Sequence, residues 1–277
     1  MKPLLKWAGG KRAIAEALES RFPEGWDGGT YIEPFLGGGA LFLHLSPKKA
    51  IVSDVNSRLI GFYRHVRDSL NPLITGIEEN ASIFDSLLAD KEKLEFYQLI
   101  RSRFNKSQPD SIESAVGVFT LNKLCFNGLY RENASGGFNV PFGKKKSFPP
   151  IVRADFSEVS KLLSKTEIFN SDFESTISKA SAGDFVYLDP PYIPLAESPS
   201  FTSYHASGFG LDEQSRLAKV MVELRSRGVN AMCSNSDTPQ TRDIYSALRL
   251  DQLLAPRMVS AKASGRGSIS ELVITNY

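Results

Sequence analysis

Seven short apolar runs, each bounded by turn-forming residues, constrain the fold of this 277-residue chain more than any other feature. Helical patterns lie between several of them, and the clearest has Leu217, Met221 and Leu224 on one face and ends near Gly228. Alternation of strand and helix is typical of a mostly parallel sheet with helices on both faces, so an α/β fold is predicted. The predicted strands are 31–32, 50–52, 168–169, 185–188, 231–233, 250–254 and 272–275.

The strand signal disappears between about residue 57 and residue 153. Tyr97, Ile100 and Phe104 step at helical spacing there, and a second helical pattern follows Ser111. The stretch 127–143 is instead rich in glycine and asparagine, which indicates a loop or a hairpin. We therefore predict a sheet domain of residues 1–56 and 154–277 that is interrupted by a helical insertion of residues 57–153.

Composition excludes several classes of protein. With 42% hydrophobic and 23% charged residues, the chain has no apolar run near the roughly 20 residues that span a bilayer. The N-terminus lacks the long apolar region of a secretion signal, so a cytoplasmic protein is expected. Cys125 and Cys233, with three scattered histidines, suit neither a disulfide framework nor a zinc site, so we expect two buried thiols and no metal.

Basic charge is concentrated between residues 120 and 153. The charged residues of this segment are Lys123, Arg131, Lys144, Lys145, Lys146 and Arg153, with Glu132 as the one acid. The whole chain, by contrast, has a net charge of only +2. A charge run is usually a solvated face, but aromatic residues such as Phe126 and Phe142 are interleaved here. That interleaving favours contact with the phosphates and bases of nucleic acid.

The tetrapeptide Asp189-Pro190-Pro191-Tyr192 directly follows the predicted strand 185–188. It is therefore expected at the carboxyl edge of the sheet, where open α/β sheets bind ligands. Proline has no backbone N–H, so the carbonyl oxygens around Asp189 and Pro190 are expected to point outward as fixed acceptors. Fixed acceptors beside the ring of Tyr192 suit an exocyclic amine on a flat heteroaromatic ring, which offers two N–H bonds and a face for stacking.

A glycine-rich stretch, 33–39 (EPFLGGG), follows the first predicted strand. Glycine has no Cβ, so the backbone can approach a ligand closely there. Asp54 ends the next strand, at a position where an acidic side chain accepts hydrogen bonds from ribose hydroxyls. Together these features indicate a nucleoside cofactor and leave nicotinamide, ATP and S-adenosylmethionine open. Phe42 stands where a dinucleotide fingerprint needs its third glycine, and Leu5 replaces the first glycine of a phosphate-binding loop ending at Lys11.

Six motifs occur in order along the chain: 5–11 (LKWAGGK), 33–39 (EPFLGGG), 53–56 (SDVN), 127–129 (NGL), 138–143 (FNVPFG) and 189–192 (DPPY). They resemble those of the Dam-type DNA adenine-N6 methyltransferases of class alpha, or D12. The resemblance implies S-adenosylmethionine as the cofactor, duplex DNA as the partner and GATC as the target. It also implies a class I methyltransferase fold, with a Rossmann-like mixed seven-stranded sheet, in which residues 57–153 form the target-recognition domain.

The resemblance assigns roles to individual residues. The catalytic residues it implies are Asp189, Pro190 and Tyr192. The cofactor-binding residues it implies are Trp7, Lys11, Glu33, Pro34, Phe35, Gly37, Gly39, Asp54 and Asp189. The DNA-binding residues are Lys6, Phe126, Asn127, Leu129, Arg131, Pro141, Lys144, Lys145 and Lys146. Phe126 stands where the best-known member has tyrosine, so a ring is still available for insertion but it carries no hydroxyl group.

Other functions remain open at this point. The DPPY motif alone also admits methyltransferases that act on cytosine N4, on RNA or on a glutamine side chain of a protein. A catalytically silent DNA-binding regulator is the alternative from a different class, although neither DPPY nor the glycine-rich stretch is damaged here. Since adenine N6 is hidden inside the duplex, an enzyme of this type is expected to extrude its target base. We expect a monomer in solution.

Overall fold

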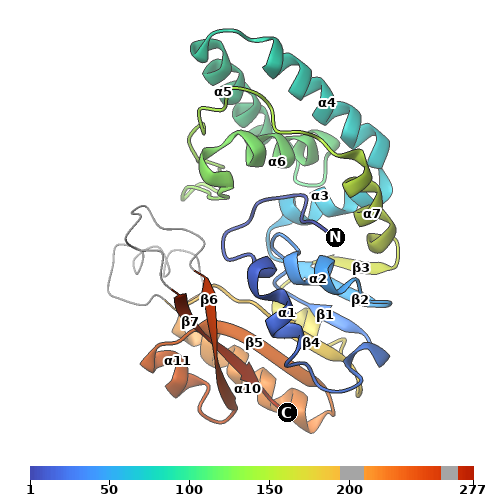
Figure 1. Ribbon diagram of the computed structural model, residues 1–277, viewed down its shortest axis with the longest axis vertical. Helices are drawn as coiled ribbons and strands as arrows, with labels where there is room; N and C mark the ends of the chain where they lie inside the picture. The colour runs from blue at the N-terminus through green and yellow to red at the C-terminus, as the bar shows by residue number, and fades with distance from the viewer. Residues whose placement is uncertain (194–208, 257–267) are drawn as a thin grey trace. The chain divides into compact units, whose positions relative to one another are not determined.

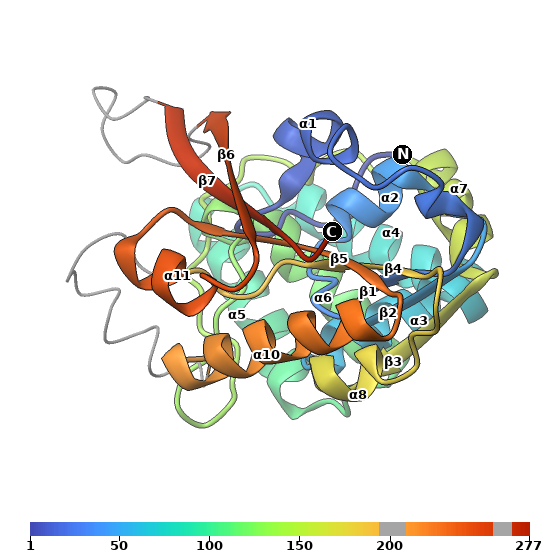
Figure 2. The same ribbon diagram turned by 90° about the horizontal axis from the view of Figure 1, so that it is seen from below.

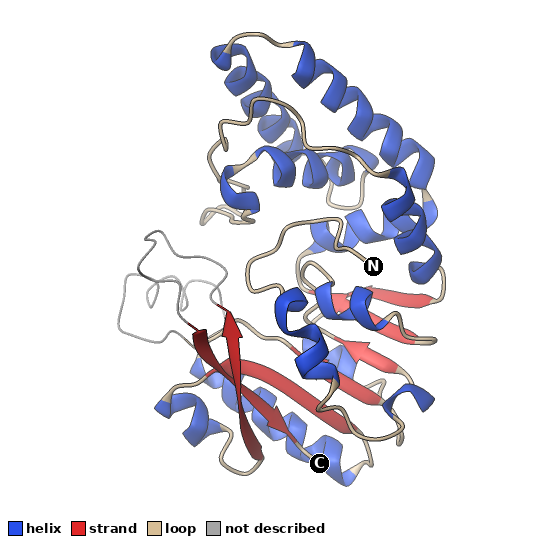
Figure 3. Cartoon of the chain, viewed as in Figure 1, coloured by secondary structure: helices blue, strands red, loops and turns tan. Residues whose placement is uncertain are grey.

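The computed structural model describes residues 1–193, 209–256 and 268–277. Its seven strands form one mixed sheet in the order β3-β2-β1-β4-β5-β7-β6, drawn as red arrows in Figure 3. Each of the seven strands predicted from the apolar runs is confirmed. Their bounds are β1 (Tyr31–Glu33), β2 (Ala50–Asp54), β3 (Thr166–Asn170), β4 (Phe185–Leu188), β5 (Asn230–Ser236), β6 (Arg249–Pro256) and β7 (Ser268–Thr275).

The pairing is parallel in the centre of the sheet and antiparallel at one edge. Strand β1 pairs in parallel with β2 and β4, and β4 pairs in parallel with β5. Strand β7 runs antiparallel to both β5 and β6. Because Tyr31 is level with Phe185, the carboxyl ends of β1 and β4 meet at the same edge. All residues of β1 and β4 are buried, as expected for central strands covered on both faces.

The described chain divides into two compact units. One, here called the sheet unit, comprises Arg12–Leu36, Pro47–Ser53 and Ser171–Tyr277. The other, here called the helical unit, comprises Met1–Lys11, Gly37–Ser46 and Asp54–Asn170. The assignment of residues 57–153 to target recognition concerns their role and stays a prediction.

Within the sheet unit, helices and aromatic side chains cover the strands. The helix predicted from the 217–224 pattern is confirmed as α10 (Leu211–Ser226), which crosses the sheet face beside β4 and β5 in Figure 2. Phe22 packs against Phe185 with ring centroids 4.3 Å apart. The other helical segments are η1 (Lys11–Ile14), whose first residue belongs to the helical unit, α1 (Ala15–Glu19), η2 (Trp26–Gly28), α8 (Phe173–Ile177) and α11 (Pro239–Ile244).

Within the helical unit, one helix is surrounded by the others. Helix α6 (Ile112–Leu124) packs against α3 (Ser57–Asp68), α4 (Leu70–Ser86) and α5 (Asp90–Lys106), as Figure 1 shows. Buried residues occur all around α6, which is the pattern of a helix in the middle of a bundle. A Cβ added at Gly117 would lie 2.7 Å from the ring of Phe104, so this glycine permits the close approach of α5 and α6. Helices α2 (Ala40–Leu45) and α7 (Arg153–Leu163) and strand β3 also belong to the helical unit.

The segment that follows α6 folds back on itself as an irregular hairpin, here called the 125–143 hairpin. It begins with η3 (Phe126–Gly128) and has isolated antiparallel bridges between Cys125 and Phe142 and between Glu132 and Phe138. The backbone N–H of Phe126 donates to the carbonyl of Pro141 at 2.9 Å. The side-chain oxygen of Asn133 accepts from two backbone N–H groups in the turn. Of the two predicted forms, loop or hairpin, the hairpin is confirmed.

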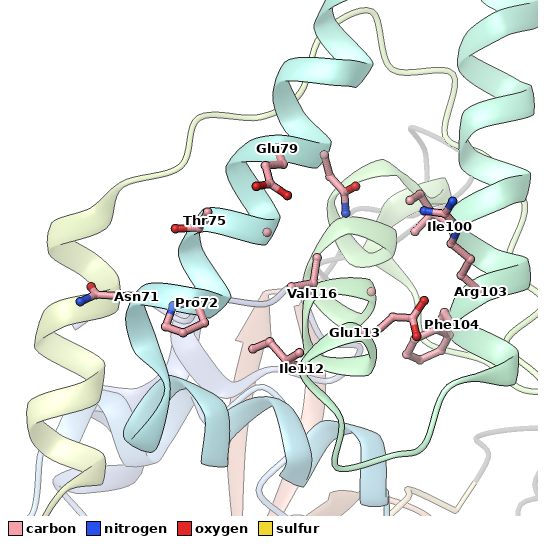
Figure 4. Close-up of a pocket in the computed structure, with 13 residues that line it drawn as sticks. Asn71, Pro72, Thr75, Glu79, Ile100, Arg103, Phe104, Ile112, Glu113 and Val116 are labelled. Atoms are coloured by element: carbon pink, nitrogen blue, oxygen red, sulfur yellow. The ribbon is translucent and has the colours of Figure 1, made fainter.

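A cavity of about 610 Å³ lies among α4, α5 and α6. Figure 4 shows its wall, which includes Thr75, Glu79, Arg103, Glu113 and Val116. No residue predicted to contact cofactor or DNA lines this cavity. Within the described ranges, no helix is both long enough and apolar enough to cross a membrane. Both cysteines are buried, as predicted, and neither is part of a disulfide.

Candidate active site and nucleic-acid interface

Three carboxylates of the sheet unit are held close to buried tyrosines at the carboxyl ends of the central strands. We call Glu33, Asp189 and Glu271 the acidic edge. Tyr31 donates its hydroxyl to Glu33 Oε2 at 2.6 Å, and Tyr192 donates to Glu271 Oε2 at 3.0 Å. Glu33 ends β1, Asp189 directly follows β4, and Glu271 lies opposite Ser236 at the end of β5.

The tyrosines at this edge remain protonated. Burial raises the pKa of Tyr31, Tyr187 and Tyr192 well above the usual value of 10.0. After burial, the charge of Asp189 is the next cause of the raised pKa of Tyr187 and of Tyr192. Asp189 therefore lies within electrostatic range of both rings. Each phenol is therefore a hydrogen-bond donor across the physiological pH range.

The loop that begins with Asp189 is tied down by buried side chains. Gln214 of α10 donates from Nε2 to the carbonyl of Pro191 at 2.8 Å, and its Oε1 accepts from Asn235 at 2.9 Å and from Tyr245 at 2.7 Å. Asn235 in turn accepts from the backbone N–H of Ile193 at 3.3 Å. Buried polar groups linked in this way hold one geometry, because any displacement leaves several of them unpaired.

One carbonyl of this loop stays available. The Pro190 carbonyl accepts no hydrogen bond from the residues that the structure describes, although Pro190 is buried. The side chain of Asp189 is half-buried and interacts with the protein. Two oxygen acceptors thus lie within three residues of Tyr192 along the chain, and the charge of Asp189 acts on that ring. That both oxygens point toward one amine, as the two prolines suggest, stays a prediction.

An aromatic cluster lies next to the acidic edge in the sheet unit. Phe35 stacks on Phe173, with ring centroids 5.5 Å apart and planes 25° apart. Phe209 meets both rings edge-on, at 5.5 and 6.0 Å. The guanidinium of Arg216 lies 4.3 Å from the centre of the Phe173 ring and bonds Asp172 at 2.6 Å. Such a cluster offers apolar faces to a flat ring, with charged groups at its margin.

In the helical unit, the glycine-rich stretch and Asp54 are directly bonded. The Asp54 carboxylate accepts from the backbone N–H of Gly37 at 2.9 Å and from that of Asn56 at 2.9 Å. Burial raises the pKa of Asp54, and the backbone N–H groups of Asn56, Gly37 and Val55 lower it in part. A carboxylate has about four lone-pair positions, so room remains for a further donor such as a ribose hydroxyl. Gly39, with φ of +63°, is the N-cap residue of α2.

The glycines serve a second purpose that the sequence does not reveal. A Cβ added at Gly37 or Gly38 would lie 2.8 or 2.7 Å from the side chain of Trp7. The absence of side chains at these two positions therefore makes room for an indole of the same unit. Trp7 itself is half-buried and stacks on Tyr130, with ring centroids 5.3 Å apart and planes 26° apart.

Two basic side chains donate to the backbone of the segment around Trp7. Lys11 is buried and donates from Nζ to the carbonyl of Gly9 at 2.7 Å. Lys123 of α6 donates to the carbonyl of Leu4 at 2.7 Å. Burial, followed by the charge of Lys6, lowers the pKa of Lys123 from 10.5 to about 8. Both ammonium groups thus stabilise the backbone of the N-terminal segment.

The predicted DNA-reading residues cluster on the 125–143 hairpin, and several are exposed. Phe126 keeps 51% of its surface exposed, which is unusual for a large apolar side chain and suits one that enters a base stack. Asn127 has φ of +56°. Arg131 is exposed and donates from Nε to Asn139 Oδ1 at 2.7 Å, which aligns its guanidinium. Pro141 is exposed and Leu129 is half-buried.

The three consecutive lysines are not equivalent. Lys144 is exposed with φ of +52°, and Lys145 is half-buried. Lys146 forms an exposed ion pair with Asp90 at 3.1 Å, and its carbonyl accepts from Lys93 Nζ. An exposed ion pair of this kind contributes little stability, but the carboxylate of Asp90 offsets the charge of Lys146. Lys144 is therefore the freest of the three to meet a phosphate.

Comparison with known proteins agrees with this geometry. Residues 7–257 match the sequence model of a family described as D12 class N6 adenine-specific DNA methyltransferase. The chain belongs to this family.

Three relatives illustrate the range of the D12 family. The chain is 38% identical over 283 residues to the Type II methyltransferase M1.LlaDCHI of Lactococcus lactis subsp. cremoris, covering 100% of this chain and 96% of the relative. It is 40% identical over 290 residues to the Type II methyltransferase M.MjaIII of Methanocaldococcus jannaschii, with 100% and 99% coverage. It is 32% identical over 274 residues to the DNA adenine methylase of Escherichia coli (strain K12), with 98% and 94% coverage.

Membership confirms the resemblance and the fold. The mixed seven-stranded sheet with its helices is the α/β fold of class I S-adenosylmethionine-dependent methyltransferases, as expected. Methyl transfer to adenine N6 of DNA is thus the activity of the family to which the chain belongs. Among the described residues, no three of His, Cys, Asp and Glu are grouped so that they could hold a metal ion.

Several residues of this D12 site were missed from the sequence. Gln214 is fully buried three positions before Leu217, so a polar residue on an apolar stripe was the signal that could have found it. Asn122, buried near the C-terminal end of α6, gave the same signal. Glu271 precedes an apolar run, and Phe173 lies in a short helix. Neither position has a distinctive pattern, and both become visible only through their contacts with Tyr192 and Phe35.

Proposed function

We propose that this chain transfers a methyl group from S-adenosylmethionine to N6 of adenine in duplex DNA, within GATC, and that it extrudes the adenine to do so. The observation that carries the proposal is the loop at the acidic edge. The side chain of Asp189 lies within electrostatic range of Tyr192, the adjoining Pro190 carbonyl accepts no bond from the described residues, and Gln214 and Asn235 hold the loop in place. Family membership supports the chemistry, and the motifs support the cofactor and the target.

The residues present fit S-adenosylmethionine. Asp54 keeps room for a ribose hydroxyl beyond the backbone N–H groups from which it accepts. The stacked pair of Phe35 and Phe173 offers a wall for an adenine ring, and the acidic edge suits a cationic sulfonium. On the strength of the motifs, we assign to the cofactor Trp7, Lys11, Glu33, Pro34, Phe35, Gly37, Gly39, Asp54 and Asp189.

When bound, S-adenosylmethionine supplies an electrophilic methyl group. The task of the protein is to make the adenine amine a nucleophile, because its lone pair is normally delocalised into the ring. Asp189 and the Pro190 carbonyl accept the two N6–H bonds, which favours a pyramidal nitrogen whose lone pair is directed out of the ring plane. Fixed acceptors of this kind stabilise the positive charge that develops on nitrogen. Tyr192 stacks on the base and keeps it oriented.

Base extrusion leaves a gap in the duplex and costs a few kcal/mol. Phe126, half of whose surface is exposed at the start of the 125–143 hairpin, is placed to fill that gap or to stack on the neighbouring pair. Base stacking and contacts with phosphates offset the cost of extrusion. The protein requires no metal and no covalent intermediate for this route.

The target GATC rests on Lys6, Asn127, Leu129, Arg131 and Pro141, which match the positions that read the target in Dam-type enzymes. Arg131 can bond O6 and N7 of a guanine together, because its guanidinium offers two parallel donors. Pro141 can contact the methyl group of a thymine. Two of the relatives are named Type II methyltransferases and one a DNA adenine methylase, so we treat the target as a proposal with its own test.

Plasmid protection tests the proposal directly. Unmethylated plasmid is incubated with the protein and S-adenosylmethionine and is then digested with two nucleases, one that cuts GATC only when methylated and one that cuts only when unmethylated. We expect the first to cut and the second to fail. Mass analysis of the released nucleosides should give N6-methyladenine. N6-methyladenine with unchanged digestion would refute GATC alone, N4-methylcytosine would refute the acceptor, and no methylated base would refute the activity.

A further inference from the structure

The N-terminal segment and the 125–143 hairpin are joined by one buried amide in the helical unit. Asn122 of α6 accepts from the backbone N–H of Lys6 at 2.9 Å through Oδ1. Its Nδ2 donates to the carbonyl of Lys6 at 2.8 Å and to the carbonyl of Gly128 at 3.2 Å. Asn122 is 4% exposed, and its bond to Gly128 is buried while its two bonds to Lys6 are partly buried. Asn122 therefore fixes both segments against α6 at the same point.

The N-terminal segment and the hairpin are also closely packed at this junction. Gly128 has φ of +67°, and a Cβ added there would lie 2.7 Å from the side chain of Lys6. A residue with a side chain at position 128 would thus be strained twice, by its backbone and by Lys6. The predicted readers Lys6, Asn127 and Leu129 are all within one residue of the groups that Asn122 bonds.

A second contact joins the hairpin to residues assigned to the cofactor. Tyr130 stacks on Trp7, and Trp7 fills the space left by Gly37 and Gly38. The Tyr130 hydroxyl donates to Glu132 Oε1 at 2.7 Å. Burial, followed by the hydrogen bond to Glu132, raises the pKa of Tyr130. Tyr130 thus contacts the sequence motif around Trp7 and belongs to the hairpin that carries the predicted readers.

We propose that Asn122 and Tyr130 couple cofactor binding to the reading of the target sequence. Both are positioning residues: neither needs to touch the cofactor or the target base. Asn122 sets the register between Lys6 and the readers that flank Gly128, and Tyr130 transmits the placement of Trp7 to the same hairpin. This inference rests on the proposed function, because it concerns the two ligands of that function.

Coupling of this kind is reciprocal. If a bound cofactor tightens binding of cognate DNA by some factor, cognate DNA must tighten binding of the cofactor by the same factor. Factors of about 5 to 150 are typical for coupled sites. A purely structural role for Asn122 would lower stability and leave this factor unchanged, so the factor separates the two explanations.

The test uses the full-length protein, the cofactor analogue sinefungin and two short duplexes, one with GATC and one with a single changed base pair. The dissociation constant of sinefungin is measured by calorimetry with and without each duplex. In the wild type we expect the cognate duplex to lower the dissociation constant of sinefungin at least five-fold. The changed duplex should lower it much less. In Asn122→Leu, which has a similar volume and makes none of the three hydrogen bonds, we expect the factor to fall to within two-fold of unity.

Two control variants exclude a general loss of structure. Asn80→Leu removes a different amide, which is half-buried and donates to Thr120 of α6 at 3.2 Å, and should keep the wild-type coupling factor. Tyr130→Phe keeps the stack on Trp7 and should keep the factor, whereas Tyr130→Leu should lower it. If Asn122→Leu does not fold, this tyrosine pair decides the outcome.

The results separate this inference from the proposed function. A wild type that methylates DNA but shows no coupling, or an Asn122→Leu protein that folds and keeps the full factor, would overturn the inference and leave the methyltransferase intact. With a misfolded Asn122 variant, equal factors in Tyr130→Phe and Tyr130→Leu would overturn it as well. A wild type that binds neither sinefungin nor DNA would instead refute the proposed function.

Discussion

The acidic edge and the 125–143 hairpin are built in opposite ways. At the acidic edge, the loop after β4 is tied by buried side chains, with Gln214 and Asn235 at the centre of the hydrogen bonds. On the hairpin, Phe126 and Arg131 are exposed, and the backbone beneath them supplies much of the support. The difference matches the two tasks. Methyl transfer needs reacting groups held within a fraction of an ångström, whereas reading DNA needs groups that can reach base edges and phosphates.

The largest expected effect comes from the acidic edge itself. Asp189→Ala removes one of the two proposed acceptors of the adenine amine, so we expect kcat to fall by about 100- to 1000-fold, as for other preorganised polar groups. Affinity for a GATC duplex should change little, because the hairpin is untouched. Single-turnover methylation and a binding titration check the two halves of this statement. Near-normal turnover would show that Asp189 takes no part in methyl transfer. The contrast drawn above between a catalytic acidic edge and a DNA-reading hairpin would then fail.

The next effect tests whether the buried support matters. Gln214→Leu leaves the carbonyl of Pro191 without its donor and separates the loop from Asn235 and Tyr245. Small misplacements of reacting groups can cost about 100-fold in rate, so we expect kcat to fall about 10- to 100-fold while DNA affinity is kept. Gln252→Leu is the matched control, since Gln252 is exposed on β6 and bonds Asp237 at 2.7 Å. A rate loss shared by both variants would assign the effect to general destabilisation.

The two regions also differ in how well their sequence predicts them. All seven strands were predicted because each contains a short apolar run, and the DPPY tetrapeptide marks the end of one. Spacing also predicted α5, α6 and α10. The antiparallel pairing of β7 with β5 and β6 was not predicted, because a local pattern carries no information about which strand lies beside which.

The supporting residues were missed for the same reason. Gln214 and Asn235 are bonded to each other from different elements, and neither belongs to a motif. The glycines at 37 and 38 were interpreted as room for a ligand, but their nearest neighbour is Trp7, which is distant in sequence. Residues that touch a ligand belong to recognisable motifs, whereas residues that hold them depend on tertiary contacts. The positional contrast between Lys144 and Lys146 likewise depends on Asp90, more than fifty residues away in the sequence.

A specificity change is expected when the hairpin is altered. Arg131→Ala removes the guanidinium that Asn139 aligns, and we expect a loss of about 1–3 kcal/mol of discrimination at one base pair of the target, with kcat on the cognate site less affected. Methylation rates on a set of duplexes with single changes measure this. Arg103→Ala, an exposed arginine of α5 outside the predicted interface, is the control. Uniform weakening on every duplex would make Arg131 a phosphate contact instead.

The smallest effect distinguishes two lysines of the same three-lysine run, Lys144 and Lys146, by their contribution to DNA affinity. Each lysine that meets a phosphate adds about 0.9 to the slope of log affinity against log salt. Lys144→Ala should therefore reduce the slope by about that amount, equally for cognate and changed duplexes. Lys146→Ala should reduce it much less, because its ammonium is already paired with Asp90 at 3.1 Å. Equal reductions would mean that the pair opens when DNA binds, and in that case Asp90→Asn should tighten DNA binding in the wild-type background.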